Sequence, residues 1–347
     1  MHRRKVVLTV LLLAAAGGRV QATDKVRVVA TLPNLASIAR EVGGDRVEVS
    51  SIATGNQDAH FVDPKPSFML KLRSADLFLV NGLDLEIGWV PPLTQGARNA
   101  RILPGAKDYV DCSADVHVVE IPSGSVSRSE GDVHPYGNPH YLSDPLNAEP
   151  VAAQIAAALS RKAPADAALF ATRRDEFTKR LHVAVFGSEL VDLVGGTKLA
   201  RLARSDELAG FLASSVVDGK PLTDRLDGWL GRMRPYAGIK VIAYHKDWSY
   251  FAPRFGLEVV DYIEPKPGIQ PSAKHREEIS VRLALGDVRM ILTRPYVEHR
   301  STDLLAGSAK LPVLTLPLEV GGHPEATDYF KLFDLLTTQI VAAAKGR

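Results

Sequence analysis

Residues 26–52 have the sequence VRVVATLPNLASIAREVGGDRVEVSSI, and this stretch decides the fold. Two β-branched runs, Val26–Thr31 and Val47–Ile52, enclose a segment whose apolar residues recur at helical spacing. The helical pattern stops at Gly43-Gly44, because glycine adopts the backbone conformations that end a helix. The stretch therefore predicts a strand, a helix and a second strand, the unit from which parallel sheets covered by helices are built.

The same alternation continues along much of the chain. After a helix that Ser67 is expected to cap, a third strand is predicted at Asp76–Val80. Four more strands follow much later, with helices between them, at Ile239–Tyr244, Glu258–Ile263, Val288–Thr293 and Val313–Leu316. A last amphipathic helix is predicted from about Glu325 to Ala344.

Between these two groups lies a long alanine-rich region without strand patterns. It runs from about Asn147 to His182 and predicts a helical connector broken only near Pro164. Residues 186–234 also have a mainly helical pattern, but the sequence does not indicate their role. We therefore predict an α/β protein with two similar lobes joined by a long rigid connecting helix. The expected divisions are residues 23–145, 146–237 and 238–347.

Residues 1–22 have the pattern of a secretory signal peptide. A basic start, Met1–Lys5, precedes the apolar run Val6–Ala16, and Val20-Gln21-Ala22 supplies a small-x-small cleavage pattern. The alternative is a membrane anchor, but a spanning helix needs about 20 apolar residues and this run is much shorter. We expect cleavage after residue 22 and a periplasmic location for the mature protein.

The composition narrows the range of partners. The 347-residue chain carries a formal charge of +2, which becomes −2 when residues 1–22 are removed, because that segment holds four basic residues and no acidic ones. A nearly neutral chain without a basic block argues against nucleic acid as a partner. The lone Cys112 excludes an internal disulfide framework and a multi-cysteine zinc site. We expect a monomer.

Three histidines occupy comparable positions. His60 follows the second predicted strand, His140 precedes a helix and His245 follows the first strand of the second group. Loops at the carboxyl ends of strands in two facing lobes converge on one cleft. Prolines at Pro64, Pro66, Pro139 and Pro145 restrict the backbone near two of these residues. Because neutral imidazole is the commonest nitrogen ligand of zinc, His60, His140 and His245 are the predicted metal ligands.

Around these histidines the chain resembles a known family. The segments are Asn56–His60 with Pro64–Ser67, Pro139-His140 to Asp144-Pro145, and Tyr244-His245 followed by Trp248–Phe251 and Phe255–Leu257. In this order they resemble the metal-specific solute-binding proteins of ABC importers, which include periplasmic zinc and manganese receptors. The resemblance implies a cation buried in a cleft between two lobes, and docking onto a membrane permease. It also implies that His60, His140 and His245 are the first three ligands.

The fourth ligand departs from the family pattern. The family usually has an aspartate that opens an Asp-Pro-Leu-Gly turn, whereas this chain has Leu316-Pro317-Leu318-Glu319. Glu319, His323, Glu298 or a water molecule are the candidates for the fourth position. The family's zinc receptors often carry a histidine-rich loop, but here residues 114–137 hold only His117 and His134. His134 is expected to be either an exposed loop residue, a partner of a ligand or an auxiliary ligand.

The remaining polar and aromatic residues allow two interpretations each. Asp144 and Asp247 are predicted either to cap helices or to orient a ligand imidazole. The aromatic residues Trp248, Tyr250 and Phe251 are predicted to line the cleft or to fill the core. His182, His275 and His299 lie in predicted helices and are treated as structural.

The donor set indicates the metal and the function. Nitrogen ligands favour Zn²⁺ over Mn²⁺, which prefers carboxylate oxygen. We therefore predict a periplasmic protein that captures zinc for an ABC permease and is not an enzyme. Two alternatives stay open. Three histidines and a water molecule could activate a nucleophile in a zinc hydrolase, although no His-Glu-x-x-His motif is present. The same scaffold could also serve a metal-binding adhesin or chaperone.

Overall fold

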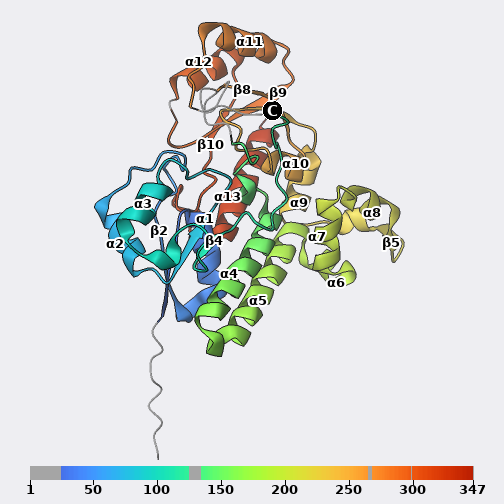
Figure 1. Cartoon of the computed structure of the whole chain (residues 1–347). Helices are drawn as coiled ribbons and strands as arrows, with labels where there is room; N and C mark the ends of the chain where they lie inside the picture. Colours follow the sequence, from blue (N-terminus) through green and yellow to red (C-terminus); the bar gives the residue numbers. More distant parts are fainter. Residues whose placement is uncertain (1–24, 125–133, 265–267, 298, 347) are drawn as a thin grey trace, which may run out of the picture.

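The computed structural model describes residues 25–124, 134–264, 268–297 and 299–346. In Figure 1 the blue-to-cyan part forms one α/β lobe and the orange part a second, with green and yellow helices beside them. The predicted signal peptide lies outside the described residues. Within the described ranges, no helix has both the length and the apolar character needed to cross a membrane.

The N-terminal lobe is built on a four-stranded parallel sheet with strand order β2-β1-β3-β4. Its elements are β1 (Val26–Ala30), α1 (Pro33–Gly43), β2 (Val47–Ser51), α2 (Pro66–Ser74), β3 (Leu77–Val80), α3 (Val90–Ala97) and β4 (Tyr109–Asp111). The strand–helix–strand unit predicted from residues 26–52 is confirmed, and β1 pairs with β2 from Val26 opposite Val47 to Ala30 opposite Ser51.

Three details of this lobe differ from the sequence prediction. The N-cap of α2 is Lys65 and not Ser67, because Pro66 takes the first helical position, where its fixed φ fits and its missing N–H costs nothing. Two further elements had no prediction. Helix α3 opens with Val90 followed by two prolines, a pattern that resembles a break more than a helix. Strand β4 has only three residues, too few to show an alternating pattern.

The C-terminal lobe repeats this architecture. Its elements are β7 (Lys240–Ala243), α10 (Phe251–Phe255), β8 (Glu258–Tyr262), α11 (Ala273–Ala284), β9 (Val288–Thr293), α12 (Arg300–Ala309), β10 (Val313–Thr315) and α13 (Tyr329–Lys345). The sheet order is β10-β9-β7-β8, with all pairs parallel. In both sheets the first strand of the lobe lies between the second and the third, and the fourth lies at the edge. The prediction of two similar lobes is thus confirmed.

The predicted helical connector consists of α4 (Ala148–Lys162) and α5 (Ala167–Phe186), with the break at Pro164. The two helices pack side by side in Figure 1, so the chain runs away from the C-terminal lobe along α4 and returns along α5. Helix α5 has 20 residues and packs against both α1 and α9 (Gly228–Met233), the helix that leads into the C-terminal lobe. It is the long helix that joins the lobes.

Residues 187–227 form a small helical unit that projects to the side of α5 in Figure 1. It contains α6 (Ser188–Val194), α7 (Gly196–Arg204), α8 (Leu208–Ser214) and a short antiparallel pair, β5 (Val216–Val217) with β6 (Lys220–Pro221). Short 3-10 helices complete the structure: η1 (Gly44–Arg46), η2 (Ala100–Ile102), η4 (Tyr141–Ser143), η5 (Pro145–Asn147), η6 (Pro164–Asp166), η7 (Leu222–Arg225) and η8 (Arg234–Tyr236).

The last helix ties the two lobes together. Helix α13, red in Figure 1, extends from the C-terminal lobe to pack against α1 and α9. At its start, the Tyr329 backbone N–H donates to Ser37 Oγ over 3.1 Å, and the Tyr329 hydroxyl donates to the Leu142 carbonyl over 2.7 Å. One buried apolar cluster includes residues from both lobes. Because this core is continuous, we expect the lobes to move little relative to one another.

Candidate metal centre

The structure brings the three predicted histidines together. His60 lies in the loop between β2 and α2, and His140 directly precedes η4. His245 is the second residue after the end of β7. Each offers one ring nitrogen, and these three atoms all lie within 4.8 Å of one another. The ring centroids of His60 and His140 are 5.2 Å apart, and His245 lies 5.5 Å from each of them. Imidazoles from both lobes therefore face one point.

The ring of His60 is held by a carboxylate two residues earlier in the chain. Asp58 Oδ1 lies 2.7 Å from Nδ1 of His60 and also accepts the His60 backbone N–H over 3.0 Å. Burial raises the pKa of Asp58, but the hydrogen bonds and charge of His60 outweigh it and lower the pKa overall. An ionised carboxylate only accepts hydrogen bonds, so Nδ1 of His60 is the donor and Nε2 is the nitrogen directed at the centre.

His245 has an equivalent partner. Its Nδ1 forms a hydrogen bond with Glu264 Oε2, just after β8, the strand next to β7. Burial lowers the pKa of His245, but the Glu264 hydrogen bond and the charges of Asp247, Glu264 and Asp58 raise it overall. Glu264 therefore orients the ring and favours its protonated form, so a metal ion must compete with a proton here.

His140 differs from the other two. Its Nε2 atom is buried and has no hydrogen-bond partner among the described residues. Burial lowers the pKa of His140 well below its usual value, and the nearby His60 and His245 lower it further. The ring is consequently neutral and carries a free nitrogen, which is the form that a metal ion requires.

The loop that carries His140 is fastened to both lobes. Asn138 Oδ1 accepts the His140 backbone N–H over 3.0 Å, and its Nδ2 donates to the Lys246 carbonyl over 2.7 Å. The Tyr250 hydroxyl donates to the Asn138 carbonyl over 2.7 Å. Asn81 Nδ2 donates to the Pro139 carbonyl over 3.0 Å from the other side. These contacts fix the distance between His140 and His245 by direct hydrogen bonds.

Comparison with known proteins identifies the family. The family model described as zinc-uptake complex component A, periplasmic (ZnuA), matches residues 28–184 and 223–343, well over half of the chain. The chain belongs to the ZnuA family. The interval between the matched segments, residues 185–222, covers most of the small helical unit beside α5.

The names of individual relatives refer to different metals. The chain is 30% identical over 177 residues to the manganese ABC transporter substrate-binding lipoprotein PsaA of Streptococcus pneumoniae serotype 4, covering 50% of this chain and 54% of that protein. It is 31% identical over 134 residues to the iron ABC transporter substrate-binding lipoprotein MtsA of Streptococcus pyogenes serotype M1, covering 38% and 43%. The chain thus matches about half the length of these curated relatives.

A crystal structure of ZnuA has the same fold. The TM-score is 0.67 at 18% identity, and the match covers 92% of this chain and 100% of the other. At this identity the likeness supports the fold and does not transfer ligand residues. The assignment of the three histidines in this ZnuA family member therefore depends on their own geometry.

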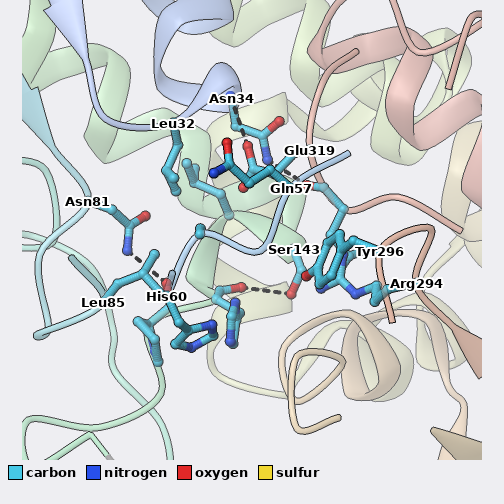
Figure 2. Close-up of a pocket in the computed structure, with 15 residues that line it drawn as sticks. Leu32, Asn34, Gln57, His60, Asn81, Leu85, Ser143, Arg294, Tyr296 and Glu319 are labelled. Carbon is cyan, nitrogen blue, oxygen red and sulfur yellow. Dashed lines mark hydrogen bonds between the residues drawn. The ribbon is translucent and has the colours of Figure 1, made fainter. Parts of the chain in front are cut away.

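The candidates for the fourth ligand lie in different places. Glu319 lines the pocket that also contains His60 and His140, but its Oε2 accepts the Asn34 backbone N–H over 3.1 Å. Figure 2 shows Glu319 beside Asn34, with His60 on the far side of the pocket. His323 Nδ1 accepts the backbone N–H of Glu325 over 3.2 Å. Glu298 lies outside the described residues. Neither Glu319 nor His323 contributes an atom to the group of donor atoms that converges at the centre.

Glu319 is nevertheless an unusual carboxyl group. Burial raises its pKa to about 8, and this rise is opposed by the Asn34 N–H and by the positive charge of Arg294. Arg294 is itself buried and pairs with Asp247, with 2.6 Å between Nε and Oδ2. Tyr296 completes this polar wall of the pocket, as Figure 2 shows. Near neutral pH Glu319 therefore carries a proton for much of the time and is a poor metal ligand.

For the residues with two predicted roles, the structure shows which role each one has. Asp144 caps η5 by accepting the Leu146 N–H over 3.0 Å, and it binds Arg254. Asp247 binds Arg294 and does not cap a helix or orient a ligand ring. The three aromatic residues are buried in the core, where Trp248 and Phe251 pack edge to face with centroids 5.3 Å apart.

Among the histidines treated as structural, His182 lies 3.5 Å from Glu149 and His275 bonds the Tyr262 carbonyl over 2.9 Å. His299 is the N-cap residue of α12. None of the three belongs to the group of nitrogens at the centre.

Sequence reasoning missed the residues that orient the site. Asp58 lies within the loop that carries the family resemblance, and its position two residues before His60 is a local signal that could have been used. Glu264 directly follows a predicted strand next to that of His245, but its role depends on which strands are neighbours. Asn138 has no sequence signal beyond its place beside Pro139.

Proposed function

We propose that this protein is the substrate-binding component of an ABC-type metal importer, which captures a divalent cation outside the cytoplasm and delivers it to a membrane permease. The observation that carries the proposal is the convergence of one nitrogen each from His60, His140 and His245 within 4.8 Å. Three imidazole nitrogens at such separations can close around one ion with small side-chain movements. The ion is cargo, and no chemical reaction is required of the protein.

We propose zinc as the cargo. The converging atoms are all imidazole nitrogens, which suit Zn²⁺, whereas Mn²⁺ prefers carboxylate and carbonyl oxygen. The carboxylates nearest to the rings, Asp58 and Glu264, bind the outer nitrogens of His60 and His245 and so support the ligands without replacing them. The relatives named for manganese and iron show that this fold serves several metals, so the donor set is the argument for zinc.

The ion-binding role also explains the architecture. The ligands come from both lobes, and hydrogen bonds and α13 link the lobes directly. A rigid pair of lobes keeps the three nitrogens near their binding positions before the ion arrives, which reduces the cost of ordering the site. We propose that the protein acts as a periplasmic monomer after removal of residues 1–22.

Calorimetric titration of the protein lacking residues 1–22 tests this function. We expect one equivalent of Zn²⁺ to bind, with weaker binding of Mn²⁺, and we expect His60→Ala, His140→Ala and His245→Ala to lose most of the zinc affinity. His117→Ala is the matched control, because His117 is an exposed histidine away from the centre. Parent-like zinc binding by all three variants would overturn the proposal. Zinc-dependent turnover of model esters would favour a hydrolase instead.

A further inference from the structure

The three converging histidines leave one position of a tetrahedral ion to be filled. Glu319 is engaged with Asn34, and Leu316, at the position where an aspartate was expected, is a buried apolar residue. A fourth histidine approaches the centre from the loop that precedes His140. His134 Nε2 lies 3.1 Å from His60 Nε2, and the two ring centroids are 5.2 Å apart.

The hydrogen bonds of His60 determine which of its nitrogens faces His134. Its Nδ1 donates to the Asp58 carboxylate over 2.7 Å, so Nε2 is the nitrogen that faces His134 and the centre.

The ring of His134 is also hydrogen-bonded to the backbone of Leu83. Since Nε2 faces His60, the nitrogen bonded to Leu83 is Nδ1. His134 therefore holds an outer partner with one ring nitrogen and turns the other toward His60.

The two nitrogens that face each other, Nε2 of His60 and Nε2 of His134, lie 3.1 Å apart. Zinc–nitrogen bonds of about 2.0–2.1 Å place two ligands of a tetrahedral ion about 3.3 Å apart. The observed separation is therefore close to that of two nitrogens bound to one ion. Like His60 and His245, His134 has an outer hydrogen-bond partner on one side of its ring, and its other nitrogen, Nε2, faces His60.

The backbone that holds His134 is itself unusual. Leu83 and Asp84 have φ values of 56° and 62°, so two successive non-glycine residues occupy the left-handed region. Such conformations are strained for residues that carry a Cβ, and they persist where the surrounding structure maintains them, most often at functional sites. Here they form the turn whose backbone is hydrogen-bonded to the ring of His134.

Resting on the metal-binding function proposed above, we propose that His134 is the fourth metal ligand and that it takes the place of the expected carboxylate, making a site of four imidazoles. His134 does not belong to the group of three nitrogens that are mutually within 4.8 Å, so its ring must move toward His140 and His245 when the ion binds. The four-nitrogen set would discriminate further against Mn²⁺.

X-ray absorption at the zinc edge and calorimetry on the protein without residues 1–22 test the proposal. The parent should show four imidazole ligands in its zinc complex. His134→Ala and His134→Gln should show three imidazoles and one added oxygen, with zinc affinity lower by at least about tenfold. His117→Ala, a histidine of the same loop outside the centre, should match the parent in both measurements.

The outcomes distinguish this inference from the function on which it rests. If His134→Ala and His134→Gln keep the ligand count and affinity of the parent while His60→Ala loses binding, His134 is not a ligand but the three-histidine receptor stands. If His60→Ala also binds zinc as the parent does, the receptor function fails. Circular dichroism of each variant establishes that the comparison is between folded proteins.

Discussion

Asp58 Oδ1 and His60 Nδ1 lie 2.7 Å apart, and this contact sets the direction in which the His60 lone pair points. We predict that Asp58→Ala lowers zinc affinity by about 10- to 100-fold, the usual effect of removing the outer partner of a ligand histidine. The ring would then rotate and lose its preference for the Nδ1–H tautomer. Calorimetry with Zn²⁺ measures the change. Asp63→Ala, which removes an exposed carboxylate from the same loop, should have little effect, and equal affinities for the two variants would contradict the prediction.

The three candidate histidines could be singled out from the sequence because each follows or precedes a regular element with a clear pattern. His245, for example, comes directly after the buried run Val241–Tyr244, and a strand with that composition ends where polar residues begin. The strands of both sheets except the three-residue β4 were predicted in the same way, since β-branched runs alternate with helical spacing. Patterns of this kind depend only on residues that are close together in the sequence, so they can be recognised without knowing the fold.

The rest of the site depends on contacts between residues that are distant in the chain. His134 and His60 are 74 positions apart, and no local pattern predicts that their rings meet. The partnership of His245 with Glu264 requires β8 to be the neighbour of β7, which follows from strand order and not from spacing. Glu319 shows the same limit, because only the folded chain places its carboxyl group against the Asn34 N–H.

The contact between His245 and Glu264 predicts how binding depends on pH. Because the pKa of His245 is raised, protons compete with zinc at higher pH than they would for an isolated ring, and affinity falls as the pH decreases. Glu264→Gln removes the negative charge and lowers the pKa of His245. The acid-side loss of zinc affinity should therefore move to lower pH in this variant, even though its affinity in neutral solution is weaker. Titrations between about pH 5 and 8 test the shift. An unchanged or higher midpoint would contradict it.

Glu319 predicts a pH-dependent stability. Its pKa in the folded protein is about 8, above the ordinary value, so the folded state holds this proton more tightly than the unfolded state does. The stabilisation is complete below the ordinary pKa of a glutamate and is lost as the pH rises through about 8. Glu319→Gln keeps an oxygen that can accept the Asn34 N–H but cannot ionise. The free energy of unfolding of the variant should exceed that of the parent by at least about 1 kcal/mol at pH near 9, since one pKa unit corresponds to about 1.4 kcal/mol.

Two further measurements make the Glu319 prediction specific. Urea unfolding near pH 5 should give nearly equal stabilities for parent and variant, because the carboxyl group of the folded parent is then protonated. Zinc affinity at neutral pH should change by no more than about twofold, since Glu319 is outside the ligand group. A large loss of affinity with Glu319→Gln would show instead that this carboxylate binds the ion.

The buried ion pair of Arg294 and Asp247 connects the loop after β9 to the loop that carries His245. Both side chains are nearly inaccessible, at 4% and 1% exposure, so removing one partner leaves an unpaired buried charge. We predict that Arg294→Met lowers the free energy of unfolding by about 3–5 kcal/mol in urea, because the Asp247 carboxylate loses its counter-charge. Lys274→Met, which breaks an exposed pair with Glu278, is the matched control and should cost less than about 1 kcal/mol.

The double variant Arg294→Met, Asp247→Leu separates charge from packing. If the unpaired charge is the cause, the double variant should recover much of the stability that Arg294→Met loses, because replacing both members of a buried pair by apolar residues is often neutral. A double variant that is less stable than Arg294→Met alone would show that the pair maintains the shape of the His245 loop instead. In that case zinc affinity should fall in parallel, since Asp247 lies only two residues after His245 and its displacement would carry the ring away from His60 and His140.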